Sequence, residues 1–191
     1  MDNKKLDIVM DVKVDMTVQL GTAKLPMKEV VELSPGAQIQ LKQKNKIGNL
    51  LGNRGKEFGT VTSRKRRCGW FDGVLVRQTI KVSGINSIAL TKLDVLDELD
   101  EIKMCVAYEL DGIKLDYLPA AVEDQIKIKP IYKTFQGWKV STSGIKDMDS
   151  LPENAKKYIF AVENFIGAKV SSISTSPERD DTILIENPFD V

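Results

Sequence analysis

The chain has 191 residues, of which 42% are hydrophobic and 29% are charged, and its formal net charge is +1. This balance is typical of a globular protein and argues against binding to nucleic acid or to an acidic membrane surface through overall charge. The sequence has no apolar run of about 18 residues, the length of a membrane span. Residues 1–5 lack the apolar core of a signal peptide, so we expect a cytoplasmic protein.

The chain contains no histidine, the residue that most often performs acid–base catalysis near neutral pH. Carboxylates and lysines could replace it, but no clustered pair stands out, so we assign no catalytic residue. Cys68 and Cys105 match no metal-binding spacing and are expected to be thiols rather than a disulfide. We therefore predict no metal site.

Residues 1–45 are predicted to form a small β-rich extension. From Val12 to Leu20 every even position is apolar and every odd position is polar, which is the period of a half-buried strand. Gly21 is expected to break this strand. A short helix over Met27–Leu33 and a second alternating strand over Ala37–Leu41 should follow.

The pattern changes at Lys42–Asn53, which is polar and basic and carries no regular periodicity. We place a domain boundary near Asn45 and predict a mixed α/β domain over residues 46–191. We expect a helix over Phe71–Lys81 and a short buried strand over Ser87–Leu90. A strand over Lys103–Leu110 should turn at Asp111-Gly112 and return over Leu115–Leu118, before an irregular segment around Pro130 and Trp138. An amphipathic helix from Leu151 to Phe165, ended by Gly167, should precede two strands, Lys169–Ser174 and Thr182–Ile185.

Thr91-Lys92-Leu93-Asp94 follows the apolar run Ile88–Leu90, which places Asp94 just past the carboxyl end of a predicted strand. In open α/β sheets, ligands bind at this edge. A carboxylate there can accept two hydrogen bonds from N1–H and the 2-amino group of guanine, whereas adenine would leave it unpaired at a cost. The alternative interpretation is an ordinary solvated strand end.

Arg64-Lys65-Arg66-Arg67 forms a run of cations within a loop that contains glycine and hydroxyl residues. Guanidinium groups bind carboxylates and phosphates through two parallel hydrogen bonds, so this loop suits a small anionic substrate. A solvated basic loop is an equally open interpretation. Ser174-Thr175-Ser176 lies in a turn after a strand, where hydroxyl groups and backbone amides could line a base pocket.

In this order and spacing, these segments resemble the C-terminal third of adenylosuccinate synthetase, a family that joins aspartate to IMP at the expense of GTP. The similarity covers about Lys46 to Asp190. It is carried by Lys56–Thr60, Arg66–Asp72, Ala89–Asp97, Cys105–Gly112, Gly137-Trp138, Leu151–Ala155 and Asn187–Phe189. It implies the C-terminal portion of a P-loop-GTPase-like α/β synthetase fold.

The resemblance also implies site residues. A substrate loop would contact aspartate, and Arg64 in it would also meet IMP; this loop comprises Thr60, Val61, Thr62, Ser63, Arg64, Lys65 and Arg66. A second group would bind GTP: Arg66, Lys92, Leu93, Asp94, Ser174, Thr175 and Ser176. The family usually has glycine where this chain has Ser63 and Ser176, which puts the loop geometry and the fit of the base in question.

The family's phosphate-binding loop, its magnesium-binding catalytic aspartate and its catalytic histidine belong to an N-terminal part that has no counterpart here. Magnesium is therefore implied only for the intact family. We expect the lone chain to be inactive in ligation, although it could bind GTP, IMP and aspartate, form a homodimer, or pair with a separate chain that supplies the missing half.

Residues 6–42 resemble a different family, the FliN-type flagellar motor switch domain with the SpoA fold. The similarity is carried by Ile8–Val12, Val18–Gly21 and Leu33–Gly36 and stops before the strands that complete that domain. A flagellar switch partner, an unrelated β-hairpin extension, and a non-functional fusion or truncation product are the alternatives that this segment leaves open.

Overall fold

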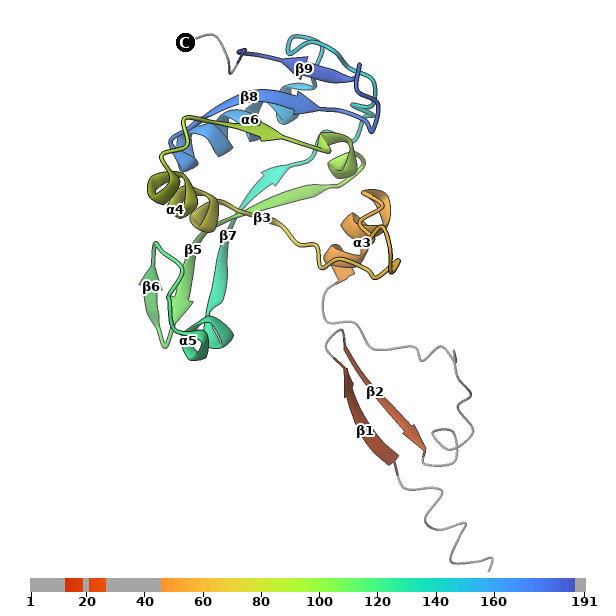
Figure 1. The fold of residues 1–191 in the computed structure, drawn as a ribbon, viewed down its shortest axis with the longest axis vertical. Coiled ribbons are helices and arrows are strands. Elements are labelled where there is room, and N and C mark those ends of the chain that lie inside the picture. The colour runs from red at the N-terminus through yellow and green to blue at the C-terminus, as the bar shows by residue number, and fades with distance from the viewer. Residues whose placement is uncertain (1–12, 19–20, 27–45, 188–191) are drawn as a thin grey trace, which may run out of the picture. The chain divides into compact units, whose positions relative to one another are not determined.

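The computed structural model describes residues 13–18, 21–26 and 46–187 (Figure 1). Contacts within the chain divide it into two compact units, Met1–Lys46 and Ile47–Val191.

The described part of the first unit is an antiparallel hairpin. Strand β1 (Lys13–Val18) pairs with β2 (Gly21–Pro26), so that Lys13 lies opposite Pro26 and Val18 lies opposite Gly21. Strand β1 ends before Gly21, as expected, but Gly21 also begins a second strand that was not predicted. Pro26 ends β2, a position where its missing N–H is tolerated. The predicted helix over Met27–Leu33 and strand over Ala37–Leu41 lie outside the described residues.

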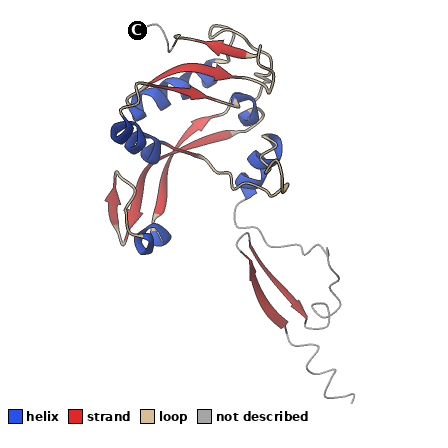
Figure 2. Cartoon of the chain, in the orientation of Figure 1, coloured by secondary structure: helices blue, strands red, loops and turns tan. Residues whose placement is uncertain are grey.

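The second unit contains two mixed sheets with helices packed against them (Figure 2). In the first sheet, β5 (Glu101–Leu110) is parallel to β3 (Phe71–Asp72) and antiparallel to β6 (Ile113–Leu115) and β7 (Lys129–Gln136). In the second sheet, β8 (Lys169–Ser174) is parallel to β4 (Ser87–Leu90) and antiparallel to β9 (Thr182–Leu184). This arrangement confirms the predicted mixed α/β class.

Helix α6 (Glu153–Ile166) contributes much of the core of this unit and contacts both sheets. Its buried side chains recur at helical spacing, as the sequence predicted, and are Ala155, Tyr158, Ile159, Val162 and Ile166. Gly167 ends the helix in the left-handed conformation with φ 73°. Helix α4 (Gly73–Ser83) begins two residues later than expected, because Asp72 caps it by accepting a hydrogen bond from the Leu75 amide at 3.1 Å.

The Asp111-Gly112 turn is confirmed, and both residues have positive φ, 49° and 82°. A two-residue loop of this kind places Leu110 opposite Ile113. The return strand must therefore begin at Ile113, and it covers Ile113–Leu115 rather than Leu115–Leu118.

Several elements of this unit were not predicted, among them α3 (Lys46–Arg54), α5 (Val122–Lys127) and β7. Helix α3 lies in the segment expected to be irregular, and its buried face includes two glycines, Gly48 and Gly52. A Cβ atom at Gly52 would lie 3.3 Å from the Cys68 sulfur, so the glycine allows α3 to pack closely against Cys68. Because glycine has a low helix propensity, the sequence did not indicate this helix. Strand β7 buries only part of Ile131 and Phe135 and exposes its other residues, so no alternating apolar pattern marks it.

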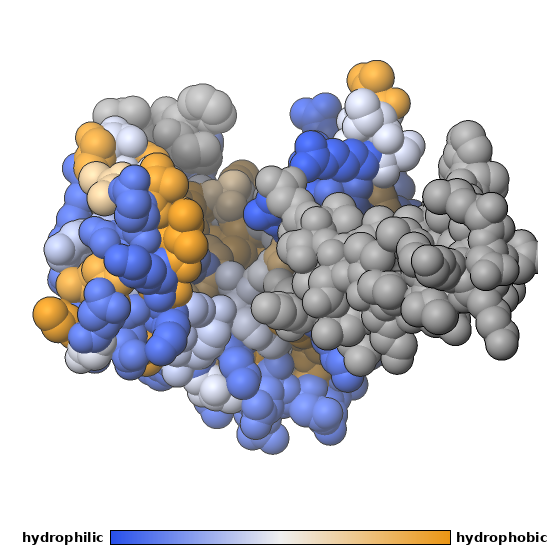
Figure 3. All heavy atoms as spheres, turned by 90° about the horizontal axis from the view of Figure 1, so that it is seen from below, coloured by the Kyte–Doolittle hydropathy of each residue, from blue (hydrophilic) through white to orange (hydrophobic). Residues whose placement is uncertain are grey.

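At the end of the unit formed by β6 and α5, several apolar side chains are exposed: Ile113, Val122 and Ile126 are 65%, 62% and 80% exposed. Figure 3, at the left of the view, shows hydrophobic residues there mixed with hydrophilic ones rather than gathered in one uniform patch. Scattered exposure of this kind is common on protein surfaces.

Candidate nucleotide site

A cavity of about 550 Å³ lies where the parallel strands β4 and β8 end. The two strands run side by side (Figure 1), and the Lys92 amide donates a hydrogen bond to Ser174 Oγ at 2.8 Å just past their ends. Lys92, Asp94, Ser174 and Ser176 all line this cavity. Four of the residues predicted to bind GTP are thus brought to one site. Strand β4 itself is only partly buried, in contrast to our expectation, because within the described residues it pairs with β8 alone.

Asp94 is the polar group in this site whose hydrogen bonding is incomplete. It belongs to a short 3₁₀ helix, η1 (Leu93–Leu96). Its Oδ1 atom is buried and has no hydrogen-bond partner among the described residues. Burial raises the pKa of Asp94 above its ordinary value, and the nearby Asp97 charge adds to the effect. A buried acceptor without a partner is costly, so the position favours a ligand that brings donors.

Asp97, three residues further on, has the opposite character. Its carboxylate is buried and accepts hydrogen bonds from Trp138 Nε1 at 2.6 Å, from the Thr142 amide at 2.6 Å and from Thr142 Oγ1 at 2.9 Å. Arg54 donates to the Asp97 carbonyl at 2.7 Å. These bonds fix the segment that carries Asp94. No role was predicted for Asp97, because its partners are more than 40 residues away along the chain.

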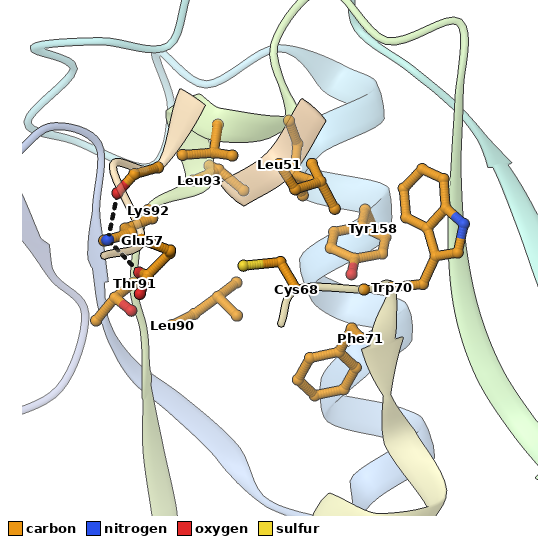
Figure 4. Close-up of a pocket in the computed structure, with 14 residues that line it drawn as sticks. Leu51, Glu57, Cys68, Trp70, Phe71, Leu90, Thr91, Lys92, Leu93 and Tyr158 are labelled. Atoms are coloured by element: carbon orange, nitrogen blue, oxygen red, sulfur yellow. Dashed lines mark hydrogen bonds and ion pairs between the residues drawn. The ribbon is translucent and has the colours of Figure 1, made fainter. Parts of the chain in front are cut away.

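Lys92 adopts the left-handed conformation with φ 61° at the start of η1. Its Nζ donates a hydrogen bond to the Gly55 carbonyl at 2.7 Å and forms an ion pair with Glu57 (Figure 4). The role in GTP binding that the resemblance implies for Lys92 stays a prediction. The observed contacts show that Lys92 links the cavity to the residues before the basic loop.

Leu93 and Thr175 turn their side chains away from the cavity. Leu93 is 1% exposed and belongs to the core. Thr175 is fully buried, with its hydroxyl oxygen 2.8 Å from the Ile145 carbonyl and 3.0 Å from the Asp181 carbonyl. Any contact of these two residues with a base would use their backbone, and that role stays a prediction.

Ser176 occupies a position where the resemblance led us to expect glycine. Its φ is not positive, so the backbone there does not require glycine. Its hydroxyl donates to Asp181 Oδ2 at 2.7 Å and accepts from the Glu178 amide at 3.0 Å. The serine therefore stabilises the turn that borders the cavity.

The basic loop forms a tight hairpin outside the cavity. Phe58 and Lys65 form an antiparallel bridge, the Gly59 amide donates to the Arg64 carbonyl at 2.8 Å, and the Ser63 amide donates to the Gly59 carbonyl at 2.8 Å. Ser63 has φ 52°, a left-handed conformation that glycine adopts more easily. Of the two serines found where the family usually has glycine, Ser63 is thus the one whose backbone conformation favours glycine.

The predicted substrate residues Thr60, Val61, Thr62, Ser63, Arg64 and Arg66 are exposed, and Lys65 is partly exposed. No residue of this described loop lines the 550 Å³ cavity. Its connection to the cavity is Glu57, which lies 3.3 Å from Arg66 Nη1 and also pairs with Lys92. Glu57 falls in the block Lys56–Thr60 that resembles the family, but no role was predicted for it.

A smaller apolar cavity of about 220 Å³ lies beside the first (Figure 4). Its walls include Leu51, Cys68, Trp70, Leu90 and Tyr158. Burial raises the pKa of the Cys68 thiol, and burial raises that of Cys105 to about 11, so neither thiol is activated as a nucleophile.

The described residues do not offer a metal centre, since no three His, Cys, Asp or Glu side chains among them gather in a way that could hold an ion. We therefore derive no step through the magnesium that the resemblance implies for the intact family. Likewise, no helix in the described part of the chain has both the length and the apolar character to cross a membrane.

A mixed α/β unit with a cavity at the carboxyl ends of two parallel strands, lined by several polar residues, defines the class of α/β ligand-binding proteins. The sequence profile of the adenylosuccinate synthetase family matches residues 13–183. The chain belongs to the adenylosuccinate synthetase family.

A solved structure agrees with this assignment. The fully ligated adenylosuccinate synthetase from Plasmodium falciparum is 39% identical to this chain, with a TM-score of 0.70. The similarity covers 74% of this chain and 34% of the other. The chain thus spans about a third of the length of that relative.

The comparisons also bear on the N-terminal segment. The family match begins at residue 13 and covers most of residues 6–42, the part that resembles a flagellar motor switch domain. Nothing in these comparisons supports the switch resemblance, and the match crosses the boundary that we predicted near Asn45.

Proposed function

We propose that residues 46–191 supply the guanine-binding cavity and the substrate loop for a GTP-dependent ligation of aspartate to IMP, a step of purine nucleotide synthesis. Membership of the synthetase family and the similarity to the Plasmodium enzyme support this function. In this proposal, Lys92, Asp94 and Ser174 to Ser176 bind the base, with Arg66 on the GTP side. Thr60 to Arg66 bind aspartate, and Arg64 also contacts IMP.

The observation that carries the proposal is the unpartnered buried oxygen of Asp94 at the cavity. Guanine presents two donors on one edge, N1–H and the 2-amino group, at a spacing that one carboxylate can accept. Adenine presents an acceptor at N1 and no donor at position 2, so it would leave the carboxylate desolvated and unpaired. The site should therefore select guanine over adenine by the base edge alone.

The chain's own residues have binding and orienting roles in this proposal. Asp94 fixes the base, the bonds of Asp97 hold the segment that carries Asp94, and the exposed arginines offer forked donors to anionic substrates. The transfer of phosphate would require the parts of the synthetase fold that this chain does not cover, whether they lie in the same polypeptide or in a complementing one.

Calorimetric titration of the full chain with GDP and with ADP tests the proposal. We expect GDP to bind at least about 10-fold more tightly than ADP, because an unpaired buried carboxylate costs roughly 1–3 kcal/mol. Asp94→Ala should abolish the preference, whereas Asp149→Ala, at an exposed aspartate outside both cavities, should retain it. Equal affinities for the two nucleotides in the unmodified chain would contradict the proposal.

A further inference from the structure

Glu57 lies where three segments of the larger unit meet. Its amide donates to the Gly52 carbonyl of α3 at 2.8 Å, and its carbonyl accepts from the Arg66 amide at 3.0 Å. One carboxylate oxygen pairs with Lys92 Nζ (Figure 4), and the other lies 3.3 Å from Arg66 Nη1. A single side chain therefore joins the basic loop to the segment that carries the base site.

The Glu57 carboxylate is suited to this bridging position. It is 25% exposed, compared with 44% to 83% for the acidic partners of most other ion pairs in the described residues. The hydrogen bond from Lys92 is the main cause that lowers the pKa of Glu57, and the charges of Lys92 and Arg66 act in the same direction. Glu57 is thus anionic at neutral pH and interacts with two cations. Such a network stabilises a structure more than an isolated ion pair at the surface does.

The contacts continue from Lys92 into the cavity. The Lys92 amide bonds Ser174 Oγ, and its Nζ also bonds the Gly55 carbonyl, so both ends of this residue are held. Lys92 lines the cavity with Asp94 and Ser174. A ligand that fills the cavity and contacts Lys92 would limit the positions that Glu57, and through it Arg66, can adopt.

We propose that Glu57 is a positioning residue that couples the basic loop to the nucleotide cavity. Occupation of the cavity then orders the loop, and occupation of the loop tightens nucleotide binding by the same factor, because coupling between two sites is reciprocal. The identity of the cavity ligand as a guanine nucleotide rests on the proposed function, whereas the link between loop and cavity rests on the contacts of Glu57.

The first experiment needs no nucleotide. Hydrogen exchange is measured at the Gly59, Ser63 and Arg66 amides, each of which is bonded within the hairpin. Glu57→Gln and Lys92→Met should each raise loop exchange several-fold, and the double variant should show no more than the larger single effect. The matched control is Glu109→Gln, which removes an ion pair with Lys129 on β5 and β7 and should leave the loop unchanged. Additive effects, or no effect, would overturn the proposal.

Salt separates a charge-based coupling from a merely structural one. In about 1 M NaCl, where the screening length is roughly 3 Å, exchange in the unmodified loop should rise toward that of Glu57→Gln, and the variant itself should not respond. An unmodified loop that is insensitive to salt would show that Glu57 acts only as a packing residue, against the proposal.

The second experiment adds GDP. Nucleotide should slow loop exchange in the unmodified chain, and Glu57→Gln should still bind GDP without slowing it. Equal protection in both proteins would refute the coupling. Failure of the unmodified chain to bind GDP would instead refute the proposed function, and the nucleotide-free measurements would then decide the role of Glu57 by themselves.

Discussion

The cavity segment Lys92–Asp94 and the basic loop Thr60–Arg66 are both polar, yet they are stabilised in different ways. The cavity segment is anchored by the buried Leu93 side chain and by the bonds of Asp97. The loop has a regular backbone, but its side chains extend into solvent. A rigid site with an unpaired acceptor is preorganised and loses little conformational entropy when a ligand binds. The loop, in contrast, must lose side-chain entropy when it binds. We therefore expect base recognition in this chain to be preorganised and substrate capture to depend on ordering.

The largest expected effect comes from removing the support of the cavity. Asp97→Ala leaves the buried donors of Trp138 and Thr142 without an acceptor, and we expect a loss of about 3 kcal/mol in the free energy of unfolding. Urea unfolding followed by tryptophan fluorescence measures it.

The control is Asp100→Ala, at a carboxylate that is 80% exposed and pairs with Lys139 at the surface. It should cost less than about 0.5 kcal/mol. Similar losses for the two variants would show that the cavity segment is no better anchored than the surface, and the contrast with the loop would fail.

A smaller effect, of opposite sign, is expected at Asp94. Because burial raises the pKa of Asp94, the folded chain holds the proton more tightly than the unfolded chain, and ionisation above that pKa costs stability. Asp94→Asn should therefore stabilise the ligand-free chain at pH 7 by about 1 kcal/mol.

This advantage should shrink as the pH falls through the raised pKa of Asp94, and it should vanish below the ordinary value of 3.8. Thermal unfolding of both proteins across this range gives the answer. A gain in stability that does not depend on pH would mean that burial does not destabilise the ionised carboxylate of Asp94.

The smallest effect concerns the loop backbone. Ser63→Gly relieves a left-handed serine with φ 52°, and part of the gain is lost to the greater freedom of glycine in the unfolded chain. We expect a net stabilisation of roughly 0.5 kcal/mol and slower hydrogen exchange in the loop.

The neighbouring Thr62, which does not have positive φ, provides the matched control. Thr62→Gly should change stability in the opposite direction. Stabilisation by both glycines would indicate that the loop responds to lost side chains rather than to backbone strain.

Elements whose structure depends on a few consecutive residues could be predicted from the sequence. The apolar spacing that includes Tyr158 and Val162 predicted α6, and Asp111-Gly112 predicted the hairpin, because helical faces and two-residue turns are properties of a few consecutive residues. Strand β7 was missed because its stability comes from pairing with β5, which its own exposed residues do not reveal.

The candidate site was predictable only in part. The position of Asp94 after a strand indicated a ligand edge, and its unpaired oxygen agrees with that expectation. The sequence could not show that Lys92 bonds Ser174, 82 residues away, because this contact depends on the parallel pairing of β4 and β8. For the same reason Glu57 was not recognised as the link between loop and cavity.

The base preference of Asp94→Asn tests the central claim most directly. Xanthine carries an oxygen in place of the 2-amino group of guanine, so an asparagine amide can donate to that oxygen while it accepts from N1–H. The unmodified chain should bind GDP about 100-fold more tightly than xanthosine diphosphate, and the variant should prefer xanthosine diphosphate, since each mismatch leaves buried groups unpaired. An Asp94→Asn variant that binds both nucleotides with the affinities of the unmodified chain would show that Asp94 does not contact the base.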